Sequence, residues 1–174
     1  GSEMCIRDRG VWVNITRRKT AELRAAEDRD LFHTLIEHIP DSIYFKNRES
    51  RFVLANTATA NKLGVPTPAD LTGRTDDYFF DQTMSDISRK EEMDIMVTGR
   101  PIRARLHHET WLHKDDSWSQ ISKFPWYGRN GELKGIVGIS SDVTKLVKTE
   151  IKATETARIL EERNRTLEKE IDLA

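Results

Sequence analysis

The chain has 174 residues, enough for one ordinary domain of about 100 to 150 residues with connecting segments and too few for two. Its 28 basic and 29 acidic residues give a net charge of -1, so we expect neither nucleic acid nor an anionic membrane as a partner. A single cysteine, Cys5, excludes an internal disulfide, and no apolar run approaches the roughly 18 residues that cross a bilayer. The composition predicts a soluble, cytoplasmic protein.

The first ten residues do not resemble a natural domain. Gly1 and Ser2 are typical of a cloning remnant, and the stretch that follows, SEMCIRDR, resembles a translated adapter. We therefore expect residues 1–10 to be a non-native leader in which Cys5 has no functional role.

The segment after the leader predicts a long helix. From Thr16 to about Ile39 it is rich in Ala, Glu, Arg and Leu and contains neither Gly nor Pro. Pro40 follows, and a proline disfavours helical geometry in the residue before it. Next, two short β-prone runs at 43–46 and 51–54 are separated by a polar tetrad, which predicts a hairpin.

Helix start and stop signals follow the hairpin. Thr67 with Pro68 behind it predicts a brief helix. A longer helix is predicted over residues 82–98, because Asp81 is a suitable N-cap and Gly99 a suitable stop.

Strand-like patterns fill the second half of the domain. Three β-prone runs at 102–112, 118–126 and 133–140 are separated by the turn-like tetrads 114–117 and 128–131. They predict an antiparallel three-stranded meander. The last run is apolar on both faces, so we expect both sides of the sheet to be covered there.

The end of the chain has a heptad pattern. From Thr144 onward there is no Gly or Pro, and a set of mostly apolar residues recurs at alternating spacings of four and three. The residues of this seam are Ala153, Ala157, Leu160, Asn164, Leu167 and Ile171. Leucine at d with one asparagine at a favours a parallel two-stranded coiled coil, so we expect a parallel homodimer. The alternative is an amphipathic helix that packs on its own sheet.

Four strings taken together, in this order, are more specific than any single motif: IPDSIYFKNRESRFVLAN, NKLGVPTPADLTGRT, VTGRPI and SKFPWYGRNGELKGIVGISSDVT. They span roughly residues 31–146 and resemble a PAS domain of bacterial signalling proteins. The resemblance implies an α+β fold, a five-stranded antiparallel sheet with helices on one face, flanked here by N- and C-terminal helical linkers. We place the domain at residues 31–144 and a signalling helix at 145–174.

A short internal echo supports a modular origin. The string VNIT at 13–16 parallels SDVT at 141–144, and in this family such an ending closes the last strand and starts the signalling helix. We expect residues 11–30 to be the tail of a preceding module and a helical linker, with a chance match as the alternative. Asp142 and Thr144 are then the signal junction, with Thr144 as the N-cap of the output helix.

The resemblance implies a sensory or relay module that couples ligand or dimer state to a C-terminal effector in bacterial signal transduction. The alternatives are a ligand-free dimerisation scaffold and a haem- or redox-sensing domain. The final residues, LEKEIDLA, resemble the linker that enters a serine phosphatase domain, with histidine kinase and nucleotide cyclase as alternative outputs. We find no phosphate loop or nucleophile motif, so we do not expect this chain itself to be an enzyme.

The long helix and the inner face of the implied sheet supply the candidate pocket residues. These are Tyr44, Met84, Ile87, Trp118, Ser119, Ile121, Lys123 and Ser140. They would suit a small organic ligand, and a filled core without a ligand is the alternative.

Cofactors receive little support from the sequence. The resemblance implies that haem would be held by a histidine on the long helix, and the helix over 82–98 contains none, so haem is disfavoured. Flavin is disfavoured because the light-sensing PAS subclass needs a cysteine and Cys5 lies in the leader. His107 and His108 are adjacent on a strand and must point to opposite faces, so we expect structural roles for them and no metal site.

Overall fold

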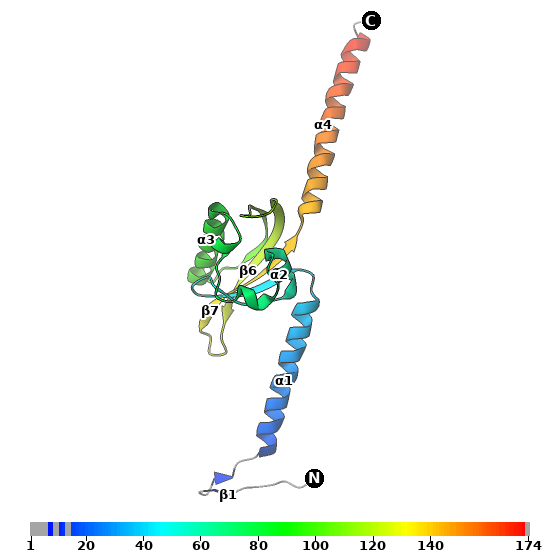
Figure 1. Ribbon diagram of the computed structural model, residues 1–174. Coiled ribbons are helices and arrows are strands. Elements are labelled where there is room, and N and C mark those ends of the chain that lie inside the picture. The colour runs from blue at the N-terminus through cyan, green and yellow to red at the C-terminus, as the bar shows by residue number, and fades with distance from the viewer. Residues whose placement is uncertain (1–6, 9–10, 13–14, 173–174) are drawn as a thin grey trace. The chain divides into compact units, whose positions relative to one another are not determined.

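The computed structural model describes residues 7–8, 11–12 and 15–172, with side-chain surroundings for residues 18–169 (Figure 1). Most of the leader expected at residues 1–10 therefore lies outside the described residues.

By its internal contacts the chain divides into two units, residues 1–40 and residues 41–174. In the first unit the two-residue strands β1 (Arg7–Asp8) and β2 (Val11–Trp12) pair antiparallel. The helix α1 (Ile15–His38) follows and contains neither Gly nor Pro. It ends just before the proline that closes this unit, which confirms the predicted helix.

The second unit is built on a five-stranded sheet. Its strands are β3 (Ser42–Asn47), β4 (Phe52–Ala55), β5 (Ile102–Glu109), β6 (Ser117–Tyr127) and β7 (Leu133–Asp142). All neighbours pair antiparallel in the order β4-β3-β7-β6-β5, so the last strand of the chain lies at the centre. This confirms the predicted sheet of an α+β fold.

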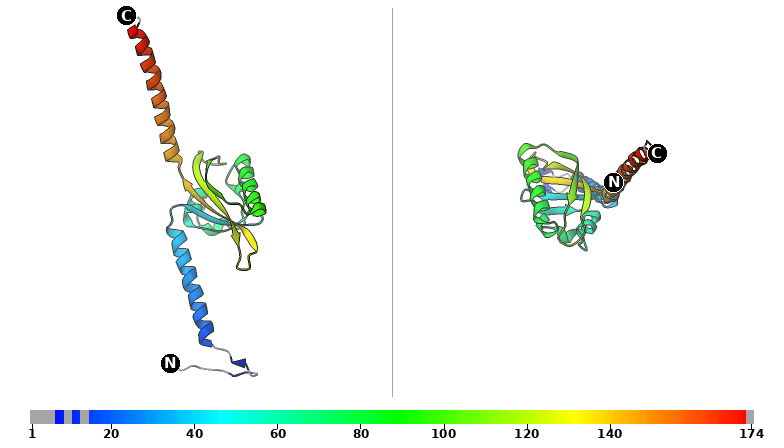
Figure 2. Two further views of the ribbon diagram at one scale, coloured as in Figure 1. Left: turned by 180° about the vertical axis from the view of Figure 1, so that it is seen from behind. Right: turned by 90° about the horizontal axis from the view of Figure 1, so that it is seen from above.

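The helical segments between β4 and β5 cover one face of this sheet (Figure 2). They are α2 (Thr57–Leu63), η1 (Pro68–Leu71), η2 (Asp76–Tyr78) and α3 (Gln82–Thr98). The predicted limits of α3 are confirmed, since the Asp81 carboxylate accepts the N–H of Met84 at 2.8 Å and Gly99 adopts a φ of 70°. The brief helix predicted after Thr67 is η1, a single 3₁₀ turn.

The strand β5 ends at Glu109, before the predicted end at Leu112. Its next residues pair with the segment before α3 instead. The Asp81 N–H donates to the Thr110 carbonyl and the Leu112 N–H to the Phe79 carbonyl, both at 3.1 Å. The β-prone run continues in the sequence, but these long-range hydrogen bonds turn the chain away from β6.

The two faces of the sheet differ because side chains alternate along each strand. The inner face, toward the helices, carries most of the polar residues described below. On the outer face Phe45, Val137 and Phe124 lie in register across three strands and are half-buried. Ile139 keeps 36% of its surface exposed. Ile43, its partner on β3, is buried, so the expectation that both sides of β7 are covered is met only in part on the outer side.

The helix α4 (Thr144–Asp172) follows β7 and begins where it was predicted. Every side chain from residue 148 to residue 169 is exposed, with Leu160 at 56% and Leu167 at 47%. The alternative, in which this helix packs on its own sheet, is therefore wrong. The side chain of Ile171 lies outside the described side chains.

Candidate functional site

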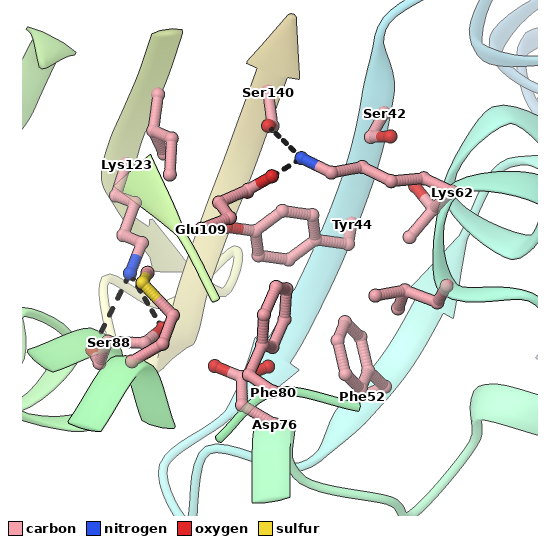
Figure 3. A pocket seen from close by; sticks show the side chains of 14 residues that line it. Ser42, Tyr44, Phe52, Lys62, Asp76, Phe80, Ser88, Glu109, Lys123 and Ser140 are labelled. Carbon is pink, nitrogen blue, oxygen red and sulfur yellow. Dashed lines mark hydrogen bonds and ion pairs between the residues drawn. The ribbon is translucent and has the colours of Figure 1, made fainter. Parts of the chain in front are cut away.

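A small cavity lies between the inner face of the sheet and the helices that cover it (Figure 3). Its volume of about 40 Å³ gives room for roughly two or three water molecules. The residues that line it are Ser42, Tyr44, Phe52, Thr59, Lys62, Leu63, Asp76, Phe80, Met84, Ser88, Glu109, Ile121, Lys123 and Ser140. The lining therefore combines aromatic and aliphatic walls with hydroxyl and charged groups.

Most of the predicted pocket residues lie at this cavity. Tyr44, Met84, Ile121, Lys123 and Ser140 line it directly. The predicted Ser119 is fully buried beside it on β6. Whether these residues bind a ligand stays a prediction.

Two predicted pocket residues lie elsewhere. Trp118 points to the outer face of β6, because it is adjacent to the inward-facing Ser119, and its ring stacks on that of His108 with centroids 4.6 Å apart. Ile87 is 45% exposed, because it lies on the side of α3 opposite the buried Ser85 and Ser88. Both residues lie in the elements that were predicted for them, β6 and α3. Their side chains point away from the cavity because of their positions within those elements.

One end of the cavity is held by Lys62, at the C-terminal end of α2. Its ammonium group donates to Glu109 Oε1 on β5 at 2.7 Å, and to Ser119 Oγ on β6 and Ser140 Oγ on β7 at 2.8 Å each. All three protons of one ammonium group are thus used to join α2 to three neighbouring strands. The sequence carried no signal for this role, because a lysine at a helix end is usually solvated.

The other end of the cavity borders a buried group of charges under α3. Lys46 is 1% exposed and donates to Asp76 Oδ2 and to Glu92 Oε1, both at 2.7 Å. Burial lowers the pKa of Lys46, but these two carboxylates raise it above its ordinary value. Burial in turn raises the pKa of Asp76, and Lys46 with Lys123 lowers it to a net value below the ordinary one.

Glu91 connects this group to β5 and β6. Its Oε1 accepts one hydrogen bond from Arg105 at 2.8 Å and one from His107 Nε2 at 2.9 Å. Its Oε2 lies 3.1 Å from Nζ of Lys123. His107 points inward, whereas His108 lies on the outer face, as the predicted alternation requires. In the described part of the chain, Glu92 Oε2 and His107 Nδ1 have no hydrogen-bond partner.

We expect acid to weaken the fold through Glu91. Burial raises the pKa of this carboxyl, but His107 and Lys123 lower it from 4.5 to about 2. Its stabilising contribution is therefore complete above about pH 4.5 and is lost as the pH falls through about 2, and it amounts to about 3 kcal/mol. Urea titrations between pH 5.5 and pH 2.5 measure this loss.

Glu91→Gln tests the assignment of that pH dependence. The variant should unfold more easily at pH 5.5 and should show a shallower loss of unfolding free energy with acid. Glu150→Gln, a change on the exposed surface of α4, is the matched control and should follow the wild type. An unchanged slope in Glu91→Gln would contradict the prediction.

The predicted signal junction connects β7, β6 and α4. Asp142 Oδ1 accepts the N–H of Thr144 at 2.8 Å, and Thr144 Oγ1 accepts the N–H of Trp118 at 2.8 Å. The Val143 N–H donates to the carbonyl of Trp118 at 2.8 Å, and the Val143 carbonyl accepts the first helical hydrogen bond, from Val147, at 2.9 Å. Burial raises the pKa of Asp142, but the hydrogen bonds from Thr144 lower it to a net value below the ordinary one.

The expected N-cap role of Thr144 is therefore wrong. Thr144 is the first residue of α4, and its hydroxyl binds the backbone of β6 rather than the next turn of the helix. The side chain ties the start of α4 to the sheet, a role that depends on a strand 26 residues earlier in the sequence.

Comparison with known proteins identifies the family to which this chain belongs. The model of the PAS fold matches residues 36–148. This chain belongs to the PAS family. A methanogenesis regulatory histidine kinase, FilI, of Methanothrix harundinacea is 23% identical over 129 residues, and a diguanylate cyclase of Vibrio cholerae is 28% identical over 132 residues. The PAS domain of Bordetella pertussis BvgS is similar in structure, with a TM-score of 0.54 at 24% identity over 75% of this chain and 98% of that one.

The matched region is a minor part of both curated relatives. It covers 74% of this chain and 14% of the kinase, and 73% of this chain and 40% of the cyclase. The comparisons therefore establish a PAS sensory module of the kind that occurs in such signalling proteins.

Two kinds of site have no support among the described residues. No group of three or more His, Cys, Asp or Glu side chains there is arranged to hold a metal ion. In the same part of the chain, no helix combines the length and the apolar character that a membrane span requires.

Proposed function

We propose that this PAS domain senses a small molecule in its cavity and passes the state of that cavity through β7 and α4 to an output domain beyond the C-terminal end. One observation carries the proposal. Ser140 lines the cavity and holds Lys62, and it lies on β7 two residues before Asp142, which binds Thr144 at the start of α4. A change at Ser140 therefore has a short covalent route to the output helix.

The relatives support a proposal for the class of output domain. The curated proteins most informative here are a histidine kinase and a diguanylate cyclase, and most of their length lies outside the matched region. A kinase or cyclase output is therefore supported, and the serine phosphatase suggested by the last eight residues stays an alternative. The chain described here is proposed to regulate and not to catalyse.

Ser140→Ala tests the route from the cavity to α4. The change removes one of the three acceptors of Lys62 without burying an unpaired charge, since Glu109 still binds the ammonium. We expect hydrogen exchange of the backbone amides in residues 143–149 to change by at least about threefold, because a typical hydrogen bond contributes about 1 kcal/mol. Amides of β4 serve as an internal reference.

Ser141→Ala is the matched control for this experiment. Ser141 is the next residue on the same strand and points to the opposite face, away from Lys62. In Ser141→Ala the backbone amides of residues 143–149 should exchange at the same rates as in the wild type. Equal rates in Ser140→Ala as well would overturn the proposed coupling.

A ligand-free dimerisation scaffold is the second candidate function. It is favoured by the apolar seam of α4, in which Leu160 and Leu167 are exposed in the single chain. A haem or redox sensor is less well supported, since a cavity of about 40 Å³ is far below the roughly 300–1,000 Å³ of pockets for larger ligands and no histidine lines it. Mass spectrometry of a denaturing extract of the purified protein separates a ligand-bound sensor from an empty scaffold.

A further inference from the structure

The charges around the cavity are already paired within the chain. Lys62 binds Glu109, and Lys123 lies between Ser88 and Glu91. Asp76, the other lining carboxylate, is bound by Lys46. A ligand that carried a net charge would have to break one of these ion pairs or enter as an unpaired buried charge, and both are unfavourable.

The polar groups of the cavity that can still form hydrogen bonds are hydroxyls on the strands β3 and β7. Ser42 on β3 and Ser140 on β7 are directly paired across the two strands, and Tyr44 follows Ser42 on the same face. Within the described residues, Ser42 Oγ and Tyr44 Oη make no hydrogen bond, although Ser42 is only 5% exposed. Ser140 Oγ accepts from Lys62 and keeps its own proton to donate.

The position of the Tyr44 ring depends on Gly138. These residues face each other across β3 and β7, and a Cβ atom at Gly138 would collide with the ring, so the glycine lets the ring lie against the strand. Burial raises the pKa of Tyr44, and the carboxylates of Glu92 and Asp76 raise it further. The phenol therefore stays neutral and can both donate and accept a hydrogen bond.

The remaining walls of the cavity are apolar. Phe80 and Met84 close it from the segment around the start of α3, and Ile121 from β6, while Phe52 packs edge-on against Tyr44 with ring centroids 5.7 Å apart. Neutral hydroxyls on one side and apolar groups on the other suit a molecule with a polar end and a short apolar end. The small volume restricts it to a few heavy atoms.

We infer that the cavity takes an uncharged molecule of a few heavy atoms, with a hydrogen-bonding group of the amide or alcohol class and a short apolar part, held by the hydroxyls of Ser42, Tyr44 and Ser140. This inference rests on the proposed function, since it names the chemical class that the sensor recognises. It excludes carboxylates and amines, which the paired charges of the cavity reject.

A set of three probes matched in shape and differing in charge tests the inference. Propionamide, propionate and propylammonium are titrated separately at neutral pH into the full chain, and the backbone amide resonances of Tyr44, Gly138 and Ser140 are followed by NMR. Propionamide should give saturable shifts at millimolar concentration. The two ions should bind at least about tenfold more weakly, because each would bury an unpaired charge.

Variants locate the site of binding. Ser42→Ala and Tyr44→Phe each remove one free hydroxyl and should weaken propionamide binding about fivefold, whereas Ser141→Ala, on the outer face of β7, should leave it unchanged. Circular dichroism and urea unfolding confirm that each variant is folded.

Three outcomes would overturn the inference: an ion that binds as tightly as propionamide, unchanged binding in both hydroxyl variants, or no saturable shift with any of the three probes. The hydrogen-exchange experiment with Ser140→Ala needs no ligand. If none of the probes binds but Ser140→Ala still alters amide exchange in α4, the proposed ligand class is refuted and the proposed coupling stands.

Discussion

Lys46→Met should lower the free energy of unfolding by about 3–5 kcal/mol, the usual cost of breaking a buried ion pair from one side. Lys46 is 1% exposed, and its ammonium is bound by Asp76 and Glu92. Methionine keeps the length of the apolar stem but leaves two carboxylates under α3 with less positive charge. Urea unfolding at pH 7 measures the loss.

Two further variants make this prediction specific. Lys90→Met changes an exposed lysine of α3 and should alter stability by no more than about 0.5 kcal/mol. The double variant Lys46→Met/Glu92→Gln lacks one of the two carboxylates that lose their partner in Lys46→Met. It should recover part of the lost stability, because Lys46 and Glu92 form an ion pair. A loss below 1 kcal/mol in the single variant, or strictly additive effects in the double variant, would contradict the assigned role of this ion pair.

Leu160→Glu should convert a dimer of this chain into a monomer. If α4 pairs as predicted, Leu160 occupies a d position of the seam and meets its counterpart in the partner helix. Burial of a leucine contributes about 1.5–3 kcal/mol, so loss of two of them should raise the dissociation constant at least about a hundredfold. Light scattering at tens of micromolar measures the mass.

The neighbouring residue is the matched control. Ile159 is 52% exposed and Leu160 is 56% exposed, but Ile159 lies off the seam, so Ile159→Glu should leave the dimer intact. For orientation, Leu167→Cys in a Cys5→Ser background should form a disulfide between equivalent residues, which only a parallel pair allows. A monomeric wild type, or failure of Leu167→Cys to cross-link in a dimer, would end the parallel coiled-coil hypothesis.

Local rules of sequence predicted most of the helices and strands of the PAS domain, whereas long-range hydrogen bonds decided where β5 ends. The limits of α3 are set by Asp81 and Gly99, whose effects reach no further than the adjacent turn, and the sheet follows from β-prone runs bounded by turn residues. The inward positions Tyr44, Ile121 and Ser140 were also found, because alternation along a strand is a local property once the family resemblance indicates which face is covered.

The chemistry of the cavity was decided by tertiary structure. Lys62 meets Glu109 47 residues away and Ser140 78 residues away, and Lys46 meets Glu92 46 residues away. Nothing in the local pattern distinguishes these lysines and glutamates from solvated ones.

The same limit explains why the roles of Trp118 and Thr144 were predicted wrongly. Trp118 and Thr144 were assigned from their own neighbourhoods, yet the hydroxyl of Thr144 binds the backbone of Trp118 across the sheet. Helix caps and strand alternation act over a few residues, whereas the partner of a buried polar group depends on which strands become neighbours and in what register. Sequence thus determined most of the helices and strands, and only the tertiary structure determined where β5 ends and which polar groups these elements bring together.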